Sequence, residues 1–133
     1  MPVNTIIPVL VYEDIDQAIT WLSTTFGFRL RWRAGNHRAQ LALGEGAIVV
    51  SAGMGEAPTS PRQDSVMIRI ADADTHYAQV KQQGAQVLEP PTDFPYGERQ
   101  YRVVDPWGHY WTFSQSIADK LPEEWGGTAG EAL

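Results

Sequence analysis

The sequence has no cysteine among its 133 residues, which excludes disulfide bonds, a thiolate nucleophile and any cysteine-based metal site. It also has no apolar run of the about 20 residues that a membrane-spanning helix needs. The N-terminal segment, MPVNTIIPV, lacks the basic region and long apolar core of a secretory signal. We therefore expect a cytoplasmic protein that has no membrane partner.

Basic residues are scarce, since 10 Lys and Arg stand against 16 Asp and Glu, for a net charge of −6. Half of this charge lies in residues 119–133, where four acidic side chains and one lysine give −3. This segment is also Gly-rich, which predicts an acidic, flexible tail. Because no stripe of basic residues is present, nucleic acid is not an expected partner.

The first half of the chain predicts a strand, a helix and three further strands. Residues 4–12 (NTIIPVLVY) are rich in β-branched and aromatic side chains, and Pro8 places this strand at an edge or a bulge. A helix is predicted to start after Asp14 and to stop at Gly27. Its apolar stripe consists of Ile15, Ala18, Ile19, Leu22 and Phe26. The three strands are expected over residues 28–33, 37–43 and 46–52.

The same order of elements is predicted again after a loop over residues 53–64. Residues 65–70 (SVMIRI) alternate as in a half-buried strand, and a helix capped by Asp72 is expected to end at Gly84. Strands are then predicted over 85–90, where Pro90 and Pro91 would stop the strand, and over 99–104 and 109–115. The pattern therefore repeats after about sixty residues, which indicates one domain over 1–118 with modules at about 1–53 and 64–118.

Residues Asp105 to Gly108 (DPWG) have the preferences of a type I turn, with Asp first, Pro second and Gly fourth. An Asp in this position hydrogen-bonds the backbone of the turn. A carboxylate used in this way is not free for proton transfer, so Asp105 is interpreted as structural rather than catalytic.

Three stretches of the chain carry a resemblance to a known family: VYEDIDQAITWLSTTFGF, IADADTHYAQVKQQGAQVLEPP and YGERQYRVVDPWGHYWTF. The chain resembles the vicinal oxygen chelate superfamily, which includes glyoxalase I, extradiol dioxygenases and bleomycin-resistance proteins. It is most similar to the small bleomycin-resistance-like members. The resemblance implies an α+β fold of two βαβββ modules, whose curved, partly open mixed sheets carry helices on the convex side. It also implies a homodimer whose subunits exchange halves.

Enzymes of this superfamily bind a divalent metal, and the resemblance places the ligands at Ile7, Val50, Ser65 and Thr112 of this sequence. None of these side chains is an ordinary ligand for Zn²⁺, Mn²⁺ or Fe²⁺, which take imidazole, carboxylate or thiolate donors. We therefore expect no metal and no other cofactor.

The three histidines do not suggest a metal site either. His37, His76 and His109 share no ligand spacing, and each is expected to be a partly exposed polar side chain.

Strand alternation predicts which side chains line the cleft of such a fold. If Thr112 faces the cleft, Tyr110 does too, and Met67 and Arg69 share the face of Ser65. Arg69 has two interpretations, a salt bridge at the cleft rim or a contact to a ligand. The remaining candidate ligand-binding residues form two walls, consisting of Trp32, Arg33, His37 and Gln40, and of Tyr96, Tyr101 and Arg102.

Rings, hydroxyls and arginines around a cleft favour a binding protein that sequesters an aromatic or cationic antibiotic or a related natural product, without a metal. An alternative is a lyase, isomerase or epimerase of the same superfamily with an atypical or absent metal site. Its general base would be Tyr110, His37 or Glu98, so no catalytic residue is assigned. A third interpretation is a dimeric structural or regulatory protein. The acidic net charge permits cationic ligands, but it does not identify one.

Overall fold

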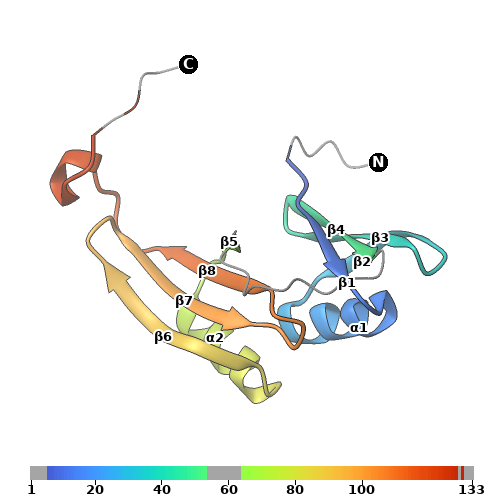
Figure 1. Cartoon of the computed structure of the whole chain (residues 1–133). Helices are drawn as coiled ribbons and strands as arrows, with labels where there is room; N and C mark the ends of the chain where they lie inside the picture. The colour runs from blue at the N-terminus through green and yellow to red at the C-terminus, as the bar shows by residue number, and fades with distance from the viewer. Residues whose placement is uncertain (1–5, 54–63, 129, 131–133) are drawn as a thin grey trace. The chain divides into compact units, whose positions relative to one another are not determined.

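A computed structural model describes residues 6–53, 64–128 and 130 of the chain. The chain divides into two compact units, which we call unit 1 (Met1–Pro61) and unit 2 (Arg62–Leu133). Each unit contains one four-stranded mixed sheet and one α-helix (Figure 1). No helix in the described residues is long and apolar enough to cross a membrane. The predicted α+β class and the twofold repeat of elements are therefore confirmed. Most of the predicted loop over 53–64 lies outside the described residues.

Unit 1 has the strand order β1-β4-β3-β2, in which β1 runs parallel to β4 and the other neighbours are antiparallel. Its elements are β1 (Val9–Tyr12), α1 (Ile15–Phe26), β2 (Arg29–Ala34), β3 (Arg38–Leu43) and β4 (Gly46–Ala52). The first strand begins at Val9, later than predicted. It is an edge strand, which agrees with the expectation from Pro8.

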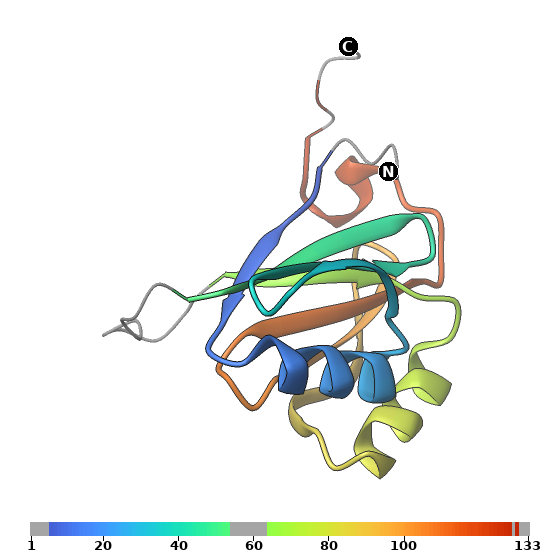
Figure 2. The ribbon, with the colours of Figure 1, turned by 90° about the vertical axis from the view of Figure 1, so that its right-hand side faces the viewer.

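Helix α1 begins and ends as its sequence predicts. The side chain of Asp14 accepts a hydrogen bond from the Gln17 backbone N–H at 3.3 Å, and Gly27 ends the helix with a left-handed φ of 85°. Four residues of the predicted stripe are buried, and Ile19 is half-buried. This apolar side of α1 covers one face of the sheet of unit 1 (Figure 2).

Unit 2 repeats this arrangement with the strand order β5-β8-β7-β6, and β5 runs parallel to β8. Its elements are β5 (Ser65–Arg69), α2 (Ala73–Gln82), β6 (Gln86–Phe94), β7 (Glu98–Val104), β8 (Tyr110–Ser116) and the 3₁₀ helix η1 (Pro122–Trp125). The Asp72 side chain caps α2 by accepting from the Thr75 backbone N–H at 3.1 Å, and Gly84, with a φ of 83°, follows the helix.

The prediction that Pro90 and Pro91 stop a strand is wrong. Strand β6 continues through both prolines to Phe94. It lies at the edge of the sheet, and its pairing with β7 shifts register between Val87 and Glu89 and again between Glu89 and Thr92. An edge strand tolerates proline because one row of its N–H groups has no partner strand, and the register shifts accommodate the two rings.

The turn before β8 is held by one carboxylate, as predicted. Asp105 is 3% exposed, and its Oδ1 accepts hydrogen bonds from the backbone N–H groups of Trp107 at 3.0 Å and His109 at 2.9 Å. Its Oδ2 accepts from Trp111 Nε1 at 3.1 Å. The backbone N–H of Gly108 donates to the Asp105 carbonyl at 3.1 Å, and Gly108 has a φ of 89°. Asp105 therefore fixes the register in which β7 meets β8.

Helix α2 divides unit 2 into a covered and an uncovered sheet face. Tyr101, Val103, Trp111 and Phe113 are fully buried on the covered face, and the side chain of Gln115 accepts from the Ala73 backbone N–H at 2.8 Å. The alternate residues of β7 and β8 point to the opposite side. We call the sheet side away from the helix the helix-free face of each unit.

The segment predicted as a flexible tail contains η1, and its Trp125 ring contacts Tyr96 of the β6–β7 hairpin. The residues just before this segment are also held to the hairpin. The backbone N–H groups of Ile117 and Ala118 donate to the Gly97 carbonyl at 2.9 and 3.2 Å. A side chain at Gly97 would meet the Ala118 oxygen at 2.2 Å, and Gly97 has a φ of 85°. This position therefore requires glycine for its backbone conformation and for the close approach of the chain.

The first testable prediction concerns Asp105. Replacing it in Asp105→Ala leaves three donors without their acceptor, so we expect the free energy of unfolding to fall by about 3 kcal/mol. Urea unfolding measures this change. The matched variant Asp119→Ala, at an exposed carboxylate, should change stability by less than about 0.5 kcal/mol. Equal effects of the two substitutions would show that the turn does not depend on Asp105.

Candidate functional site

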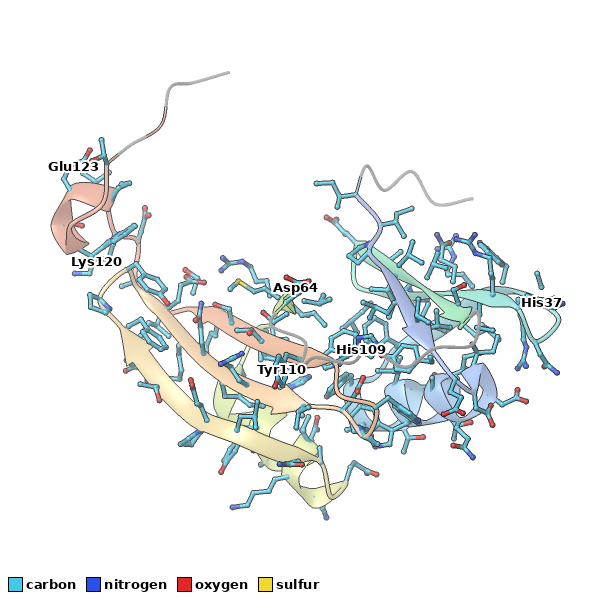
Figure 3. The ribbon with its side chains drawn as sticks, viewed as in Figure 1. His37, Asp64, His109, Tyr110, Lys120 and Glu123 are labelled. Carbon is cyan, nitrogen blue, oxygen red and sulfur yellow. The ribbon has the colours of Figure 1, made fainter. Side chains whose placement is uncertain are left out.

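The helix-free face of unit 2 is built from three neighbouring strands and is rich in polar side chains. Register and alternation place on it Ser65, Met67, Arg69, Glu98, Gln100, Arg102, Tyr110, Thr112 and Ser114. Five of these were predicted as ligand-binding residues, namely Met67, Arg69, Arg102, Tyr110 and Thr112. Figure 3 shows Tyr110 on β8 in this unit. The structure thus brings together one group of the predicted site residues on a single sheet face.

A continuous chain of hydrogen bonds crosses this face. Arg69 Nη2 lies 3.0 Å from Glu98 Oε1, and the Ser114 hydroxyl donates to the same oxygen at 2.8 Å. Gln100 Nε2 donates to Ser114 Oγ at 3.1 Å, and the Tyr96 hydroxyl donates to Gln100 Oε1 at 3.2 Å. The chain orients each member, because every link uses a specific donor and acceptor.

Glu98 is the least exposed charged group on this face. Its side chain is 15% exposed, whereas that of its partner Arg69 is 64% exposed. Both contacts to the carboxylate use Oε1, and no donor in the described part of the chain reaches Oε2. One oxygen of a shielded carboxylate therefore keeps its capacity to accept hydrogen bonds from a bound molecule.

The sequence interpretation placed no carboxylate in the cleft with certainty and considered Glu98 only as a possible base. Glu98 is the first residue of β7, and its direction follows from the register with β8, where it pairs with Ser116. The start of this strand was predicted at residue 99, so its first side chain lay outside the alternation argument.

Three aromatic rings lie at one end of the hydrogen-bonded chain. The rings of Phe94 and Tyr96 stack with centroids 5.4 Å apart and planes 12° apart, and the Trp125 ring meets Tyr96 edge-on at 5.6 Å. We call these residues the aromatic cluster. Tyr96 was predicted, but Phe94 and Trp125 were not, because one follows the two prolines and the other lies in the predicted tail. Trp125 is 40% exposed, so its ring surface is accessible.

The Arg102 guanidinium and the Tyr110 ring lie together elsewhere on the helix-free face of unit 2. The Arg102 guanidinium carbon lies 5.6 Å from the centre of the Tyr110 ring, and Arg102 Nη1 lies 3.6 Å from Glu89 Oε1. Both ions of this pair are partly exposed, so the pair itself adds little stability.

The positions that hold a metal in related enzymes lack metal donors here. Thr112 Oγ1 donates to Ser65 Oγ at 3.3 Å, so these two hydroxyls bond to each other. In unit 1 the assignment of Val50 is wrong by one residue. In unit 2, Thr112 of β8 pairs with Met67 of β5, and the equivalent pair in unit 1 is Val49 of β4 with Val9 of β1. Val50 is instead fully buried beside Ala39 on the covered face. The register, not the count from the helix cap, decides this position.

Neither valine can bind a metal ion, and hydroxyls alone are poor ligands for transition metals. Within residues 6–53, 64–128 and 130, no three His, Asp or Glu side chains lie close enough together to hold an ion. The donor set therefore does not fit the metal that the superfamily's enzymes use.

Some predicted site residues lie away from the helix-free faces. Tyr101 is fully buried under α2, where its ring stacks with Phe113 at 5.2 Å, so it belongs to the core. Arg33 Nη2 lies 2.5 Å from Asp16 Oδ1 of α1, on the covered side of unit 1. His37 is exposed at the turn between β2 and β3 (Figure 3).

Trp32 and Gln40 lie opposite each other on β2 and β3 of unit 1. Both point to its helix-free face, since the adjacent Arg33 and Ala39 point to the covered one. Two predicted residues are thus brought together in unit 1, and five others in unit 2.

One histidine differs from the expectation of partly exposed side chains. His109 is buried, with 4% exposure. His76 on α2 is half-buried, and its Nδ1 shares a hydrogen bond with the Tyr101 hydroxyl. Burial lowers the pKa of His76 from its ordinary value of 6.5, and burial raises the pKa of the Tyr101 hydroxyl. This pair joins α2 to β7 and contributes to the core of unit 2.

Comparison with known proteins gives one family. Residues 5–113 match the family described as the Glyoxalase/Bleomycin resistance protein/Dioxygenase superfamily. The crystal structure of TioX from Micromonospora sp. ML1 is 32% identical, with a TM-score of 0.73, and the match covers 86% of this chain and 99% of TioX. No curated protein matches the sequence.

Two more distant structures share the fold. A glyoxalase/bleomycin resistance protein/dioxygenase from Nocardioides is 20% identical with a TM-score of 0.73, and the match covers 96% of this chain and 91% of that one. A protein of the same description from Alicyclobacillus acidocaldarius is 19% identical with a TM-score of 0.68, over 89% and 95% of the two chains.

The second testable prediction concerns His76 and pH. Because the pKa of His76 is lower in the folded protein, the unfolded chain takes up its proton first as the pH falls below 6.5. Stability is therefore lost as the pH falls from 6.5 through the folded pKa. Urea unfolding at several pH values should show this loss, and His76→Gln should reduce it. Parallel profiles for the native protein and His76→Gln would contradict the argument.

Proposed function

Because the chain belongs to the glyoxalase/bleomycin resistance protein/dioxygenase superfamily, we propose that it binds a small aromatic cation without a metal and sequesters it. Membership of this superfamily supports a small-molecule binding or resistance-type role. The observation that carries the finer proposal is the shielded Glu98 carboxylate, whose Oε2 accepts no hydrogen bond from the described residues. It belongs to a hydrogen-bonded chain that leads to the aromatic cluster.

A protonated amine or amidine is the natural partner for Glu98. A carboxylate that is 15% exposed is screened less by salt than a surface carboxylate, and hydrogen bonds between ions are stronger than neutral ones. Arg69 already shows that a cation is accepted at this place. Since its side chain is 64% exposed, the ion pair is weak enough for a ligand cation to share or replace it.

The aromatic cluster suits the planar part of such a ligand. Phe94 and Tyr96 are held parallel, and Trp125 brings a further ring edge-on, so the cluster offers flat apolar surface with little loss of side-chain freedom on binding. The hydrogen bonds from Tyr96 through Gln100 and Ser114 to Glu98 fix the position of the aromatic cluster relative to the carboxylate. The proposed ligand class is therefore a planar aromatic compound with a cationic nitrogen, such as an antibiotic or related natural product.

The proposed assembly is a homodimer whose subunits exchange halves, as the resemblance to bleomycin-resistance proteins implies. Large apolar side chains that are exposed in the isolated chain support a partner surface, including Ile6 at 82% and Leu121 at 67% exposure. Sedimentation equilibrium should give twice the chain mass, and a monomer at micromolar concentration would contradict this part of the proposal.

The third testable prediction compares two dyes that share one ring system. 9-Aminoacridine is cationic at neutral pH, whereas acridine is neutral there. Tryptophan fluorescence quenching or calorimetry should show tighter binding of the cation. Glu98→Gln should weaken the binding of 9-aminoacridine by about tenfold or more, since a hydrogen bond to a charged group contributes about 1.5–3 kcal/mol. The binding of acridine should be unchanged.

The control is Glu89→Gln, which removes a carboxylate that is 53% exposed and pairs with Arg102. Its effect on 9-aminoacridine should be less than about threefold. The proposal is contradicted if the two dyes bind with equal affinity. It is also contradicted if Glu89→Gln and Glu98→Gln weaken the binding of 9-aminoacridine to the same degree.

A further inference from the structure

Two buried polar atoms in unit 1 have no hydrogen-bond partner among the described residues, Trp32 Nε1 and Gln40 Oε1. Gln40 is 1% exposed, so its Oε1 atom is removed from water without a compensating hydrogen bond from the described residues. Native proteins pair nearly all such groups, because a buried donor or acceptor left unpaired lowers stability. An unpaired donor and an unpaired acceptor in one unit require a physical explanation.

The two side chains are direct cross-strand partners in the β2–β3 pair. Both lie on the helix-free face of unit 1, because the flanking Arg33 bonds to Asp16 of α1 and the flanking Ala39 and Leu41 are fully buried. Side chains of directly opposed residues lie about 5 Å apart at their Cβ atoms. One small polar group of a ligand can therefore reach both.

A register shift aims Trp32 at this face. Leu30 pairs with Leu41, and the next recorded pair is Trp32 with Gln40, so Arg31 is an extra residue in β2. Without the shift, Trp32 would oppose Ala39 and point to the covered side. Bulges that redirect a side chain are common beside binding sites, and this one puts an indole N–H next to a buried amide.

Apart from Arg29, Arg38 and Ser51, the rest of this face is apolar. Val49 pairs with Gln40 on one side and with Val9 on the other, and Val9 and Val11 on the edge strand are 53% and 45% exposed. A flat ring laid against β1 would cover the two exposed valines, Val9 and Val11. Its polar edge would then meet Gln40 and Trp32, whose unpaired atoms can form directed hydrogen bonds there.

We propose that Trp32 and Gln40 form a subsite for a carboxamide group carried on a planar ring. The ligand carbonyl accepts from Trp32 Nε1–H and from the Gln40 amide, while the ligand N–H donates to Gln40 Oε1. A primary amide, or a lactam with its N–H and C=O on the same side, pairs with a glutamine amide through two hydrogen bonds. An ester has the carbonyl but not the donor, so it leaves Gln40 Oε1 unpaired.

Binding requires the Trp32 side chain to move, because both atoms are shielded from solvent. Trp32 is half-buried and lies on an edge strand, beside a register shift. The unpaired atoms lower the stability of the unliganded protein, and hydrogen bonds from the ligand remove this loss.

This subsite goes beyond the cation site of unit 2 and is tested with unit 1 residues alone. It shares with the proposed function only the assumption that the protein binds small molecules. Failure of the amide experiment leaves the acridine comparison unaffected, and failure of the Glu98 experiment does not decide the amide one.

The experiment follows the Trp32 indole N–H signal in ¹⁵N–¹H spectra, with the signal assigned from its loss in Trp32→Phe. The probes are 2-naphthamide and methyl 2-naphthoate, which differ in the N–H donor. We expect 2-naphthamide to shift the Trp32 signal and to bind about tenfold more tightly than the ester, because a site built to pair a donor discriminates against an analogue that lacks it.

Gln40→Met keeps the volume and removes the amide. We expect it to abolish the preference for 2-naphthamide and to leave the melting temperature unchanged or raised, since a buried unpaired acceptor is lost. Gln82→Met, at an exposed glutamine of α2, should keep the preference. The proposal is overturned if 2-naphthamide at millimolar concentration does not move the Trp32 signal, if the ester binds equally well, or if Gln40→Met retains the preference. Should Gln40→Met not fold, the probe comparison on the native protein decides alone.

Discussion

The hydrogen bonds to the Asp105 carboxylate are the interaction on which the geometry of unit 2 depends. They close the turn between β7 and β8 and so fix which residues of the two strands face each other. A slip of one residue would turn Glu98 and Gln100 under α2 and bring Tyr101 to the opposite side. The polar chain that carries the proposed function exists because this one buried side chain selects one register.

The two units share one arrangement of helix and sheet but differ in the side chains on their helix-free faces. In each unit a helix packs on one face of the sheet, and the opposite face is free of helix. In unit 2 that face has polar side chains that bond to one another, with one carboxylate oxygen left available. In unit 1 that face carries Trp32 and Gln40, whose Nε1 and Oε1 atoms are buried without a hydrogen-bond partner in the part of the chain that the structure describes. A duplicated fold thus offers two surfaces with different chemistry.

Local rules predicted the elements well, because helix caps and turns depend on neighbouring residues. Asp14, Gly27, Asp72 and Asp105 act as expected. The errors arose where pairing between distant strands decides. Pro90 is tolerated because β6 is an edge strand. The position assigned to Val50 belongs to Val49 because of the register between β1 and β4. Arg33, predicted to line the cleft, forms an ion pair with Asp16 of α1 instead. The aromatic cluster could not be found from sequence, since it joins a hairpin to a ring about thirty residues later in the chain.

The central claim is that the helix-free face of unit 2 holds a cationic aromatic molecule without a metal. Mapping ¹⁵N–¹H shifts during titration with 9-aminoacridine, with a chelator present, tests this most directly. The account predicts that the Gln100 side-chain amide, the Trp125 indole and the backbone amides from Tyr96 to Gln100 show the largest changes. Shifts concentrated on α2, or binding that appears only after a transition metal is added, would contradict it.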